Sequence, residues 1–195
     1  MAANTEIITA EQLAIQQSYS QRVRDYWQDR GRIPAAYIDT YGCQQNEADS
    51  ERLLGMLREM GYSHQTEPEG ADVVLINTCS VREHAEQRVF GNVGALTHTK
   101  RRHPDQKIFL TGCMAGEERV VARLKKSYPH VDGVLTSHAQ WMLPEILYKS
   151  LTEGGRQFVT PETGNIVEGL PVARLGSLKG WVSIMYGCNN FCTYC

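Results

Sequence analysis

The stretch that decides the fold is ADVVLINT, residues 71–78. Its apolar run is almost uninterrupted, which is typical of a parallel β-strand covered by helices on both faces. Residues 46–61 before it place leucines at helical spacing and close on Gly61. Residues 80–96 after it open with SVRE, a capping-box sequence, and show a second apolar helical face. A strand between two helices is therefore the unit from which the fold is built.

The same alternation extends in both directions along the chain. Further strands are predicted at 35–42, 107–112 and 131–137, and further helices at 9–30, 117–128 and 139–150. Pro144 lies in the middle of the last of these helices and weakens it. Strands that alternate with helices of this length predict an α/β fold, a parallel sheet of the Rossmann or flavodoxin-like kind with right-handed crossovers.

Composition divides the chain into four parts. Residues 1–33 are predicted to form a helical extension, 34–150 the α/β domain, and 151–180 a linker rich in glycine and proline that could hold a short hairpin. The stretch GWVSIMYG at 180–187 predicts the first strand of another domain, of which 181–195 would be the start. We therefore expect an N-terminal fragment of a longer protein.

The overall composition is that of a soluble globular protein, with 42% hydrophobic and 22% charged residues among 195. No run approaches the ~20 apolar residues of a membrane span, and the N-terminus lacks the features of a secretory signal. We therefore predict no membrane association and a cytoplasmic, reducing location. A net charge of −2 gives no support for nucleic-acid binding by this chain's own field. The basic runs at 100–102 and 125–126 are interpreted as solvated helix ends.

Six cysteines are the chemically distinctive residues. They are Cys43, Cys79, Cys113, Cys188, Cys192 and Cys195. In a secreted mini-protein six cysteines could pair in fifteen ways, but a reducing compartment disfavours disulfides. Ligation of a metal or an iron–sulfur cluster is the stronger interpretation.

The first cysteine set, Cys43, Cys79 and Cys113, follows three successive predicted strands. In a parallel sheet such turns lie along one carboxyl edge, where ligands bind. Each thiol also precedes a predicted helix, whose N-terminus favours the thiolate, and small neighbours in YGC, NTC and TGC leave room for a bulky inorganic group. Two alternatives stay open: three buried, inert cysteines, or a zinc site, for which His84 is the nearest candidate fourth ligand.

The second cysteine set, Cys188, Cys192 and Cys195, has the spacing C-x3-C-x2-C. Three thiols on one short loop suit three corners of a [4Fe–4S] cube, whose fourth ligand in ferredoxins is another cysteine. A missing fourth ligand leaves one iron open to bind something else. This pattern indicates chemistry, whereas four thiolates would indicate electron transfer.

These motifs resemble those of a known family. CNNFCTYC is similar to the cluster loop of the radical S-adenosylmethionine (SAM) superfamily. TYGCQQNEADSERL, NTCSVREHAEQRVFG and TGCMAGEE, in that order, extend the resemblance to the methylthiotransferases, which are transferases with two clusters. The resemblance implies that the second cysteine set holds a [4Fe–4S] cluster that binds SAM at the start of a radical SAM (β/α) barrel, with Tyr194 against the adenine. It also implies that the first cysteine set holds a second [4Fe–4S] cluster that carries the sulfur to be inserted.

Within this family, GCQQN and NTCSVRE are most similar to the branch that modifies tRNA. That branch adds a methylthio group to C2 of N6-dimethylallyladenosine next to the anticodon, while sister branches act on threonylcarbamoyladenosine tRNA or a ribosomal protein. A C2–H bond is not acidic, so its removal calls for a radical. The resemblance further implies three partners: a low-potential electron donor, a sulfur donor, and tRNA bound through a part of the protein beyond residue 195. It also implies that the protein is a monomer and that this fragment alone is inactive. The competing interpretations are an iron–sulfur or zinc module without catalysis of its own, and an interaction domain with incidental cysteines.

Overall fold

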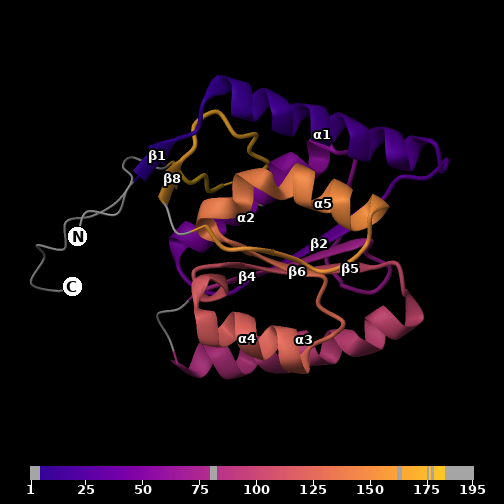
Figure 1. Cartoon of the computed structure of the whole chain (residues 1–195), viewed down its shortest axis with the longest axis vertical. Coiled ribbons are helices and arrows are strands. Elements are labelled where there is room, and N and C mark those ends of the chain that lie inside the picture. The colour runs from indigo at the N-terminus through magenta and orange to yellow at the C-terminus, as the bar shows by residue number, and fades with distance from the viewer. Residues whose placement is uncertain (1–4, 80–82, 162–163, 175, 177, 183–195) are drawn as a thin grey trace, which may run out of the picture.

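A computed structural model describes the chain except residues 1–4, 80–82, 162–163, 175, 177 and 183–195. A parallel sheet forms its centre, and helices cover both faces (Figure 1). In chain order the elements are β1 (Thr5–Ile7), α1 (Ala10–Gln28), β2 (Ala35–Thr40), α2 (Gln44–Glu59), β3 (Ser63–His64), β4 (Val73–Thr78), α3 (Glu83–Arg102), β5 (Lys107–Gly112), the 3₁₀ turn η1 (Met114–Gly116), α4 (Glu118–Ser127), β6 (Gly133–Thr136), the 3₁₀ turn η2 (Ser137–Met142), α5 (Leu143–Thr152), β7 (Gln157–Val159) and β8 (Gly164–Ile166).

The main sheet has the strand order β3-β2-β4-β5-β6-β7, and every neighbouring pair is parallel. Within this sheet, β3 follows β2 along the chain and lies beside it at one edge. Strands β4 to β7 are added on the other side of β2. This is the flavodoxin-like order of a doubly wound sheet. The parallel α/β fold predicted from the sequence is confirmed.

All six residues of β4 are buried, as the apolar run of 71–78 predicts. Side chains alternate across the strand, so Leu75 packs with α1, α2 and α5 while Val74 and Ile76 pack with α3 and α4. The two helical layers are visible on opposite sides of the sheet in Figure 1. Complete burial of one such aliphatic side chain contributes about 1.5–3 kcal/mol, so this strand anchors both layers.

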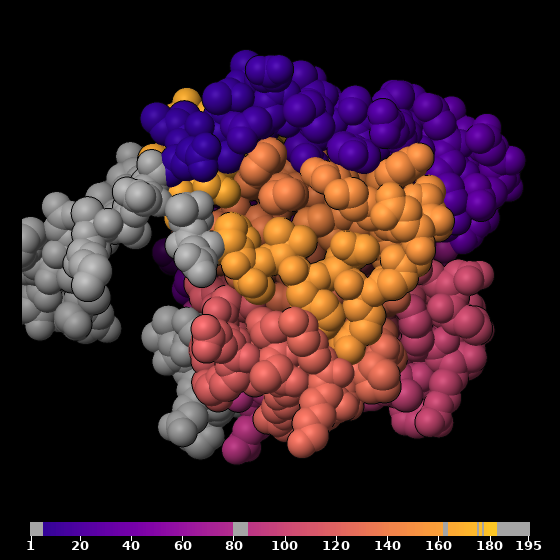
Figure 2. Space-filling model, in the orientation of Figure 1, coloured from indigo at the N-terminus to yellow at the C-terminus, as the bar shows by residue number. Residues whose placement is uncertain are grey.

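The N-terminal helix α1 lies against α5 on one face of the sheet, as the space-filling view also shows (Figure 2). The indole N–H of Trp27 donates to the Tyr62 hydroxyl over 2.9 Å, and both side chains are buried. Helix α1 is thus packed on the α/β core. No helix among the described residues is long and apolar enough to cross a membrane.

Residues 151–180 contain two strands, but they do not form the predicted hairpin. Strand β7 adds to the main sheet beside β6, and β8 pairs in parallel with β1. The hairpin prediction is wrong because the two strands belong to different sheets. The barrel strand predicted at 180–187 lies outside the described residues beyond Val182.

Two local predictions are also corrected. Helix α5 begins at Leu143, after a 3₁₀ turn, so Pro144 lies in its first turn, where a missing N–H breaks no helical hydrogen bond. Lys100 is not a solvated residue, because its ammonium bonds to the Asp132 carboxylate over 2.8 Å and its side chain is 18% exposed. The capping box predicted from Ser80 lies outside the described residues.

Candidate iron–sulfur site at the carboxyl edge of the sheet

The first cysteine set lies at the ends of three adjacent strands. Cys79 follows β4 directly and Cys113 follows β5 directly, while Cys43 is the N-cap of α2, three residues after β2. Since β2, β4 and β5 are neighbours and parallel, all three cysteines lie along the same carboxyl edge. The structure thus brings together residues that are about 35 positions apart in the sequence.

This edge includes the point where the sheet changes its direction of winding. The chain first moves outward from β2 to β3 and then returns to place β4 on the other side of β2. In doubly wound sheets, ligands bind at this switch point. Cys43 and Cys79 flank it, and Cys113 is one strand further along.

A single main-chain carbonyl connects the three cysteine loops. The Thr78 oxygen accepts a hydrogen bond from the Asn46 Nδ2 over 2.9 Å and another from the Cys113 N–H over 2.9 Å. The other end of the Asn46 amide accepts from the Cys43 thiol, with Sγ and Oδ1 3.2 Å apart. Thr78 itself precedes Cys79. Hydrogen bonds to the Thr78 carbonyl and to the Asn46 amide therefore hold the three cysteine loops together.

A buried polar network supports this connection. The Asn77 amide donates to the Asn46 carbonyl over 2.8 Å and to the Ser50 hydroxyl over 2.9 Å, and it accepts from Asn46 Nδ2 over 3.1 Å. Asn46 is 1% exposed, so its amide depends on these protein partners. Sequence reasoning missed Asn46 and Asn77 as site residues. The available signal was their polarity: Asn77 interrupts the apolar run of β4 near its end, and Asn46 follows Cys43 by three residues.

Two glycines permit close packing at the cysteine edge. Gly42 has φ 131°, and a Cβ there would collide with the Cys79 side chain. Gly112 has φ 95°, and its Cβ would lie 2.6 Å from the Asn77 Oδ1 and 2.7 Å from the Thr78 N. Glycine is therefore required at both positions by conformation and by packing, and it permits close contact there rather than the predicted space for a bulky group.

The electrostatic environment differs from the one predicted for Cys113. Burial raises the pKa of the Cys113 thiol, and the charges of Cys79, Cys43 and Asp49 raise it further, whereas a hydrogen bond from Ser137 lowers it. The prediction that a helix N-terminus favours its thiolate is wrong at this position. A 3₁₀ turn follows Cys113, and α4 begins only at Glu118.

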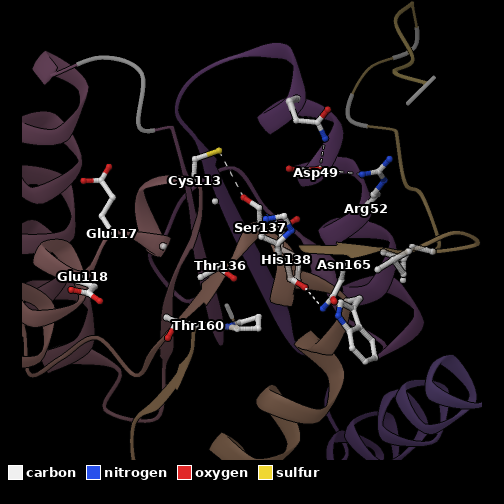
Figure 3. A pocket seen from close by; sticks show the side chains of 18 residues that line it. Asp49, Arg52, Cys113, Glu117, Glu118, Thr136, Ser137, His138, Thr160 and Asn165 are labelled. Atoms are coloured by element: carbon white, nitrogen blue, oxygen red, sulfur yellow. Dashed lines mark hydrogen bonds and ion pairs between the residues drawn. The ribbon is translucent and has the colours of Figure 1, made fainter. Parts of the chain in front are cut away.

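A cavity of about 830 Å³ opens beside Cys113 (Figure 3). Cys113 lies at its wall with Ser137 close by, at an Oγ to Sγ distance of 3.8 Å. Asp49 and Arg52 of α2 line it from the other side, joined by an ion pair of 3.1 Å. Cys43 and Cys113 are exposed, whereas Cys79 is buried. The edge therefore has open space next to the exposed thiol of Cys113.

The described thiols are not arranged as a complete set of metal ligands. Within the part of the chain that the structure describes, no group of three Cys, His, Asp or Glu side chains is arranged to hold a metal ion. Cys188, Cys192, Tyr194 and Cys195 lie outside the described residues, and so does the side chain of His84. The sequence prediction of ligand roles for these residues stays a prediction.

Fold and edge together define a doubly wound α/β domain with three cysteines at its switch-point edge. Residues 35–136, which run from β2 to β6 and include the first cysteine set, match Uncharacterized protein family UPF0004, and the chain belongs to this family.

Similar proteins carry a more specific name. The tRNA-2-methylthio-N(6)-dimethylallyladenosine synthase of Alkaliphilus oremlandii is 46% identical over 190 residues, covering 97% of this chain and 40% of the relative. The proteins of the same name from Thermoanaerobacter sp. and Clostridioides difficile are 42% and 41% identical, each covering 96% of this chain and 40% of the relative. The resemblance to the methylthiotransferases is confirmed. The chain spans about 40% of the length of these relatives.

Proposed function

We propose that this chain is the cluster-bearing part of a radical SAM methylthiotransferase that adds a methylthio group to C2 of N6-dimethylallyladenosine next to the tRNA anticodon. The observation that carries the proposal is the first cysteine set on adjacent strands, linked through the Thr78 carbonyl. The name of the similar proteins supports the substrate.

The residues present suit an iron–sulfur cluster. Thiolates are soft ligands that favour iron–sulfur clusters over hard cations such as magnesium. The cavity beside Cys113 leaves room for a bulky group next to this thiol. Cys43, Cys79 and Cys113 would hold one [4Fe–4S] cluster, and the second cysteine set would hold another together with SAM, near Tyr194. When bound, these groups would supply a radical for hydrogen abstraction and a sulfur atom for insertion.

The chain's own residues contribute position and access. Asn46 and Thr78 hold the three loops in register, and the two glycines let these loops approach one another closely. Burial keeps Cys79 at the inner side of the edge, while Cys43 and Cys113 are reachable from outside. The cavity beside Cys113 gives a partner or substrate a route to this edge.

The remaining assignments follow the same proposal. Residues 34–150 serve as the methylthiotransferase α/β domain, residues 1–33 as an extension whose helix packs on it, 151–180 as a linker whose strand β7 completes its sheet, and 181–195 as the start of the radical SAM domain. The partners are tRNA, bound through the part beyond residue 195, a low-potential electron donor and a sulfur donor. The protein acts as a cytoplasmic monomer, and this chain alone leaves tRNA unmodified.

Cluster content tests the proposal directly. Iron and acid-labile sulfide per chain are measured after anaerobic reconstitution of the native chain and of two matched triple variants. Cys43→Ala/Cys79→Ala/Cys113→Ala should lose one cluster, and Cys188→Ala/Cys192→Ala/Cys195→Ala should lose the other. If the first variant keeps all the iron of the native chain, the first cysteine set binds no cluster and the proposal fails.

A further inference from the structure

The chain after β8 runs back along α2. We call residues 170–174, 176 and 178–182 the strap. The Ala173 N–H donates to the Glu51 carbonyl over 2.9 Å, and the Trp181 indole N–H donates to the Glu47 carboxylate over 3.1 Å. Further along α2, the Pro171 backbone lies against Gly55. The strap thus follows α2 from its C-terminal half, at Gly55, to its first turn, at Glu47.

The contacted residues of α2 form one stripe. Gly55, Glu51 and Glu47 are each four positions apart, so they lie above one another on the same helical face. We call these three residues the α2 stripe. A regular spacing of contacts along a helix indicates a surface shaped for an extended segment.

Gly55 is the part of the stripe that allows close approach. Glycine inside a helix is less favourable than alanine. A Cβ at this position would lie 2.5 Å from the Pro171 carbonyl carbon and 2.8 Å from the Val172 nitrogen. The backbone of the strap therefore packs directly on the backbone of α2, and only glycine permits this contact.

Glu51 is the charged part of the stripe. Its side chain is 6% exposed and pairs with Arg174 over 2.5 Å. Arg174 also donates to the Trp181 carbonyl over 3.1 Å, which joins the middle of the strap to its C-terminal part. A buried carboxylate needs such a partner. Displacing the strap would leave Glu51 without this partner.

The strap ends close to the first cysteine set. Cys43 is the N-cap of α2, and the Glu47 N–H donates to its carbonyl over 3.2 Å. The residue to which Trp181 donates its hydrogen bond, Glu47, therefore lies one helical turn from Cys43. Cys188 follows Trp181 by seven residues, a reach of at most ~25 Å.

We infer that the α2 stripe docks the strap and thereby fixes the point at which the chain leaves the α/β domain, at Trp181, whose indole bonds to Glu47 one helical turn from Cys43. Because Cys188 is only seven residues further on, this exit point limits how far the second cysteine set can lie from the first. The significance for the two clusters rests on the proposed function, whereas the docking itself does not.

Limited proteolysis tests the docking. Trypsin can cut after Arg174 and Lys179 in the strap, and an alanine at position 55 should displace the backbone there. We expect Gly55→Ala to raise the cleavage rate at both sites at least tenfold, followed by mass spectrometry under native conditions. Gly91→Ala is the matched control, because a Cβ at this exposed position of α3 would have open space among the described atoms.

A second variant covers the case in which Gly55→Ala does not fold. Glu51→Gln keeps the helix and removes the charge opposite Arg174, so cleavage after Lys179 should also accelerate. If the folded variants are cut at the native rate, the docking inference is overturned.

A separate measurement tests whether the docked strap limits the distance between the two clusters. After reconstitution and reduction, electron paramagnetic resonance of the native chain should show spin coupling between two clusters. Gly55→Ala should keep the iron content and lose the coupling. A strap that is released without any change in coupling overturns the spacing role. A native chain that binds no iron contradicts the proposed function instead, and the proteolysis result still decides the docking.

Discussion

Asn46 and Cys113 donate hydrogen bonds to the same acceptor, the Thr78 carbonyl oxygen, each over 2.9 Å. The loop after β2 is thereby tied to the loop after β5 through the end of β4, which lies between them. The Oδ1 of Asn46 also accepts a hydrogen bond from the Cys43 thiol. The cysteine edge therefore behaves as one unit whose parts come from three separate regions of the chain.

Replacing Asn46 should loosen this unit. Asn46→Ala removes both ends of the amide and leaves buried partners at Asn77 and Thr78 short of hydrogen bonds, at a cost of about 1–3 kcal/mol. We expect this loss in urea unfolding of the iron-free chain, together with faster loss of iron to a chelator. Gln87→Ala at an exposed position of α3 is the control. Equal stability of the two variants would contradict the role assigned to Asn46.

The glycine before Cys113 should not tolerate a side chain. Gly112→Ala forces a positive φ on alanine and places its Cβ against the end of β4, so we expect a loss of roughly 2–3 kcal/mol in the free energy of unfolding. Gly116→Ala is the nearby comparison, because its Cβ would meet Thr136 Cγ2 at an ordinary 3.7 Å. Similar unfolding midpoints for the two variants would show that the close contact at Gly112 is absent.

The three thiols of the first cysteine set should differ in reactivity. Cys43 and Cys113 are exposed, whereas Cys79 is 5% exposed. Iodoacetamide should therefore modify Cys79 at least about tenfold more slowly, because local opening must precede its reaction. The cysteines fall in separate tryptic peptides, so mass spectrometry reports each rate. Modification of Cys79 as fast as that of Cys43 would place it at the surface.

Alkaline pH should destabilise the core through Tyr62. Burial raises the pKa of the Tyr62 phenol above its usual range, against the opposing effect of the Trp27 hydrogen bond. Above about pH 10 the unfolded chain loses the phenolic proton first, so stability should fall as the pH rises. Below that pH the phenol is protonated in both states and gives no pH dependence.

The comparison uses Tyr62→Phe, with urea unfolding between about pH 8 and 11. The variant should be about 1–3 kcal/mol less stable at pH 8, because the buried Trp27 N–H loses its acceptor. Its stability should decline less steeply at high pH than that of the native chain. Parallel pH profiles would mean that Tyr62 ionises normally.

Local patterns in the sequence predicted the architecture and the edge of the site. The apolar run of β4 and the alternation around it are sufficient for a parallel sheet, and the sheet then aligns Cys43, Cys79 and Cys113. Neither step needs knowledge of a specific contact. Each follows from strand geometry and from the order of the elements.

The contacts between distant residues could not be predicted in this way. Asn46 meets Thr78 across 32 positions, and Arg174 meets Glu51 across 123. Such pairs form only when the surrounding layers have closed. The same limit explains the errors at β7 and at Cys113, since a three-residue strand and a 3₁₀ turn are stabilised by their neighbours more than by their own sequence.

The pairing of β1 with β8 brings two distant parts of the α/β domain side by side. Thr5 aligns with Gly164 and Ile7 with Ile166, so at β8 the polypeptide returns to lie beside its first described strand. Domains whose ends adjoin tolerate insertion into a surface loop of a host protein, because the host need not stretch to accommodate them. Because the strap that follows β8 packs on α2 and pairs with Glu51, a cassette that carries the three cysteines to a new scaffold must include the strap as well.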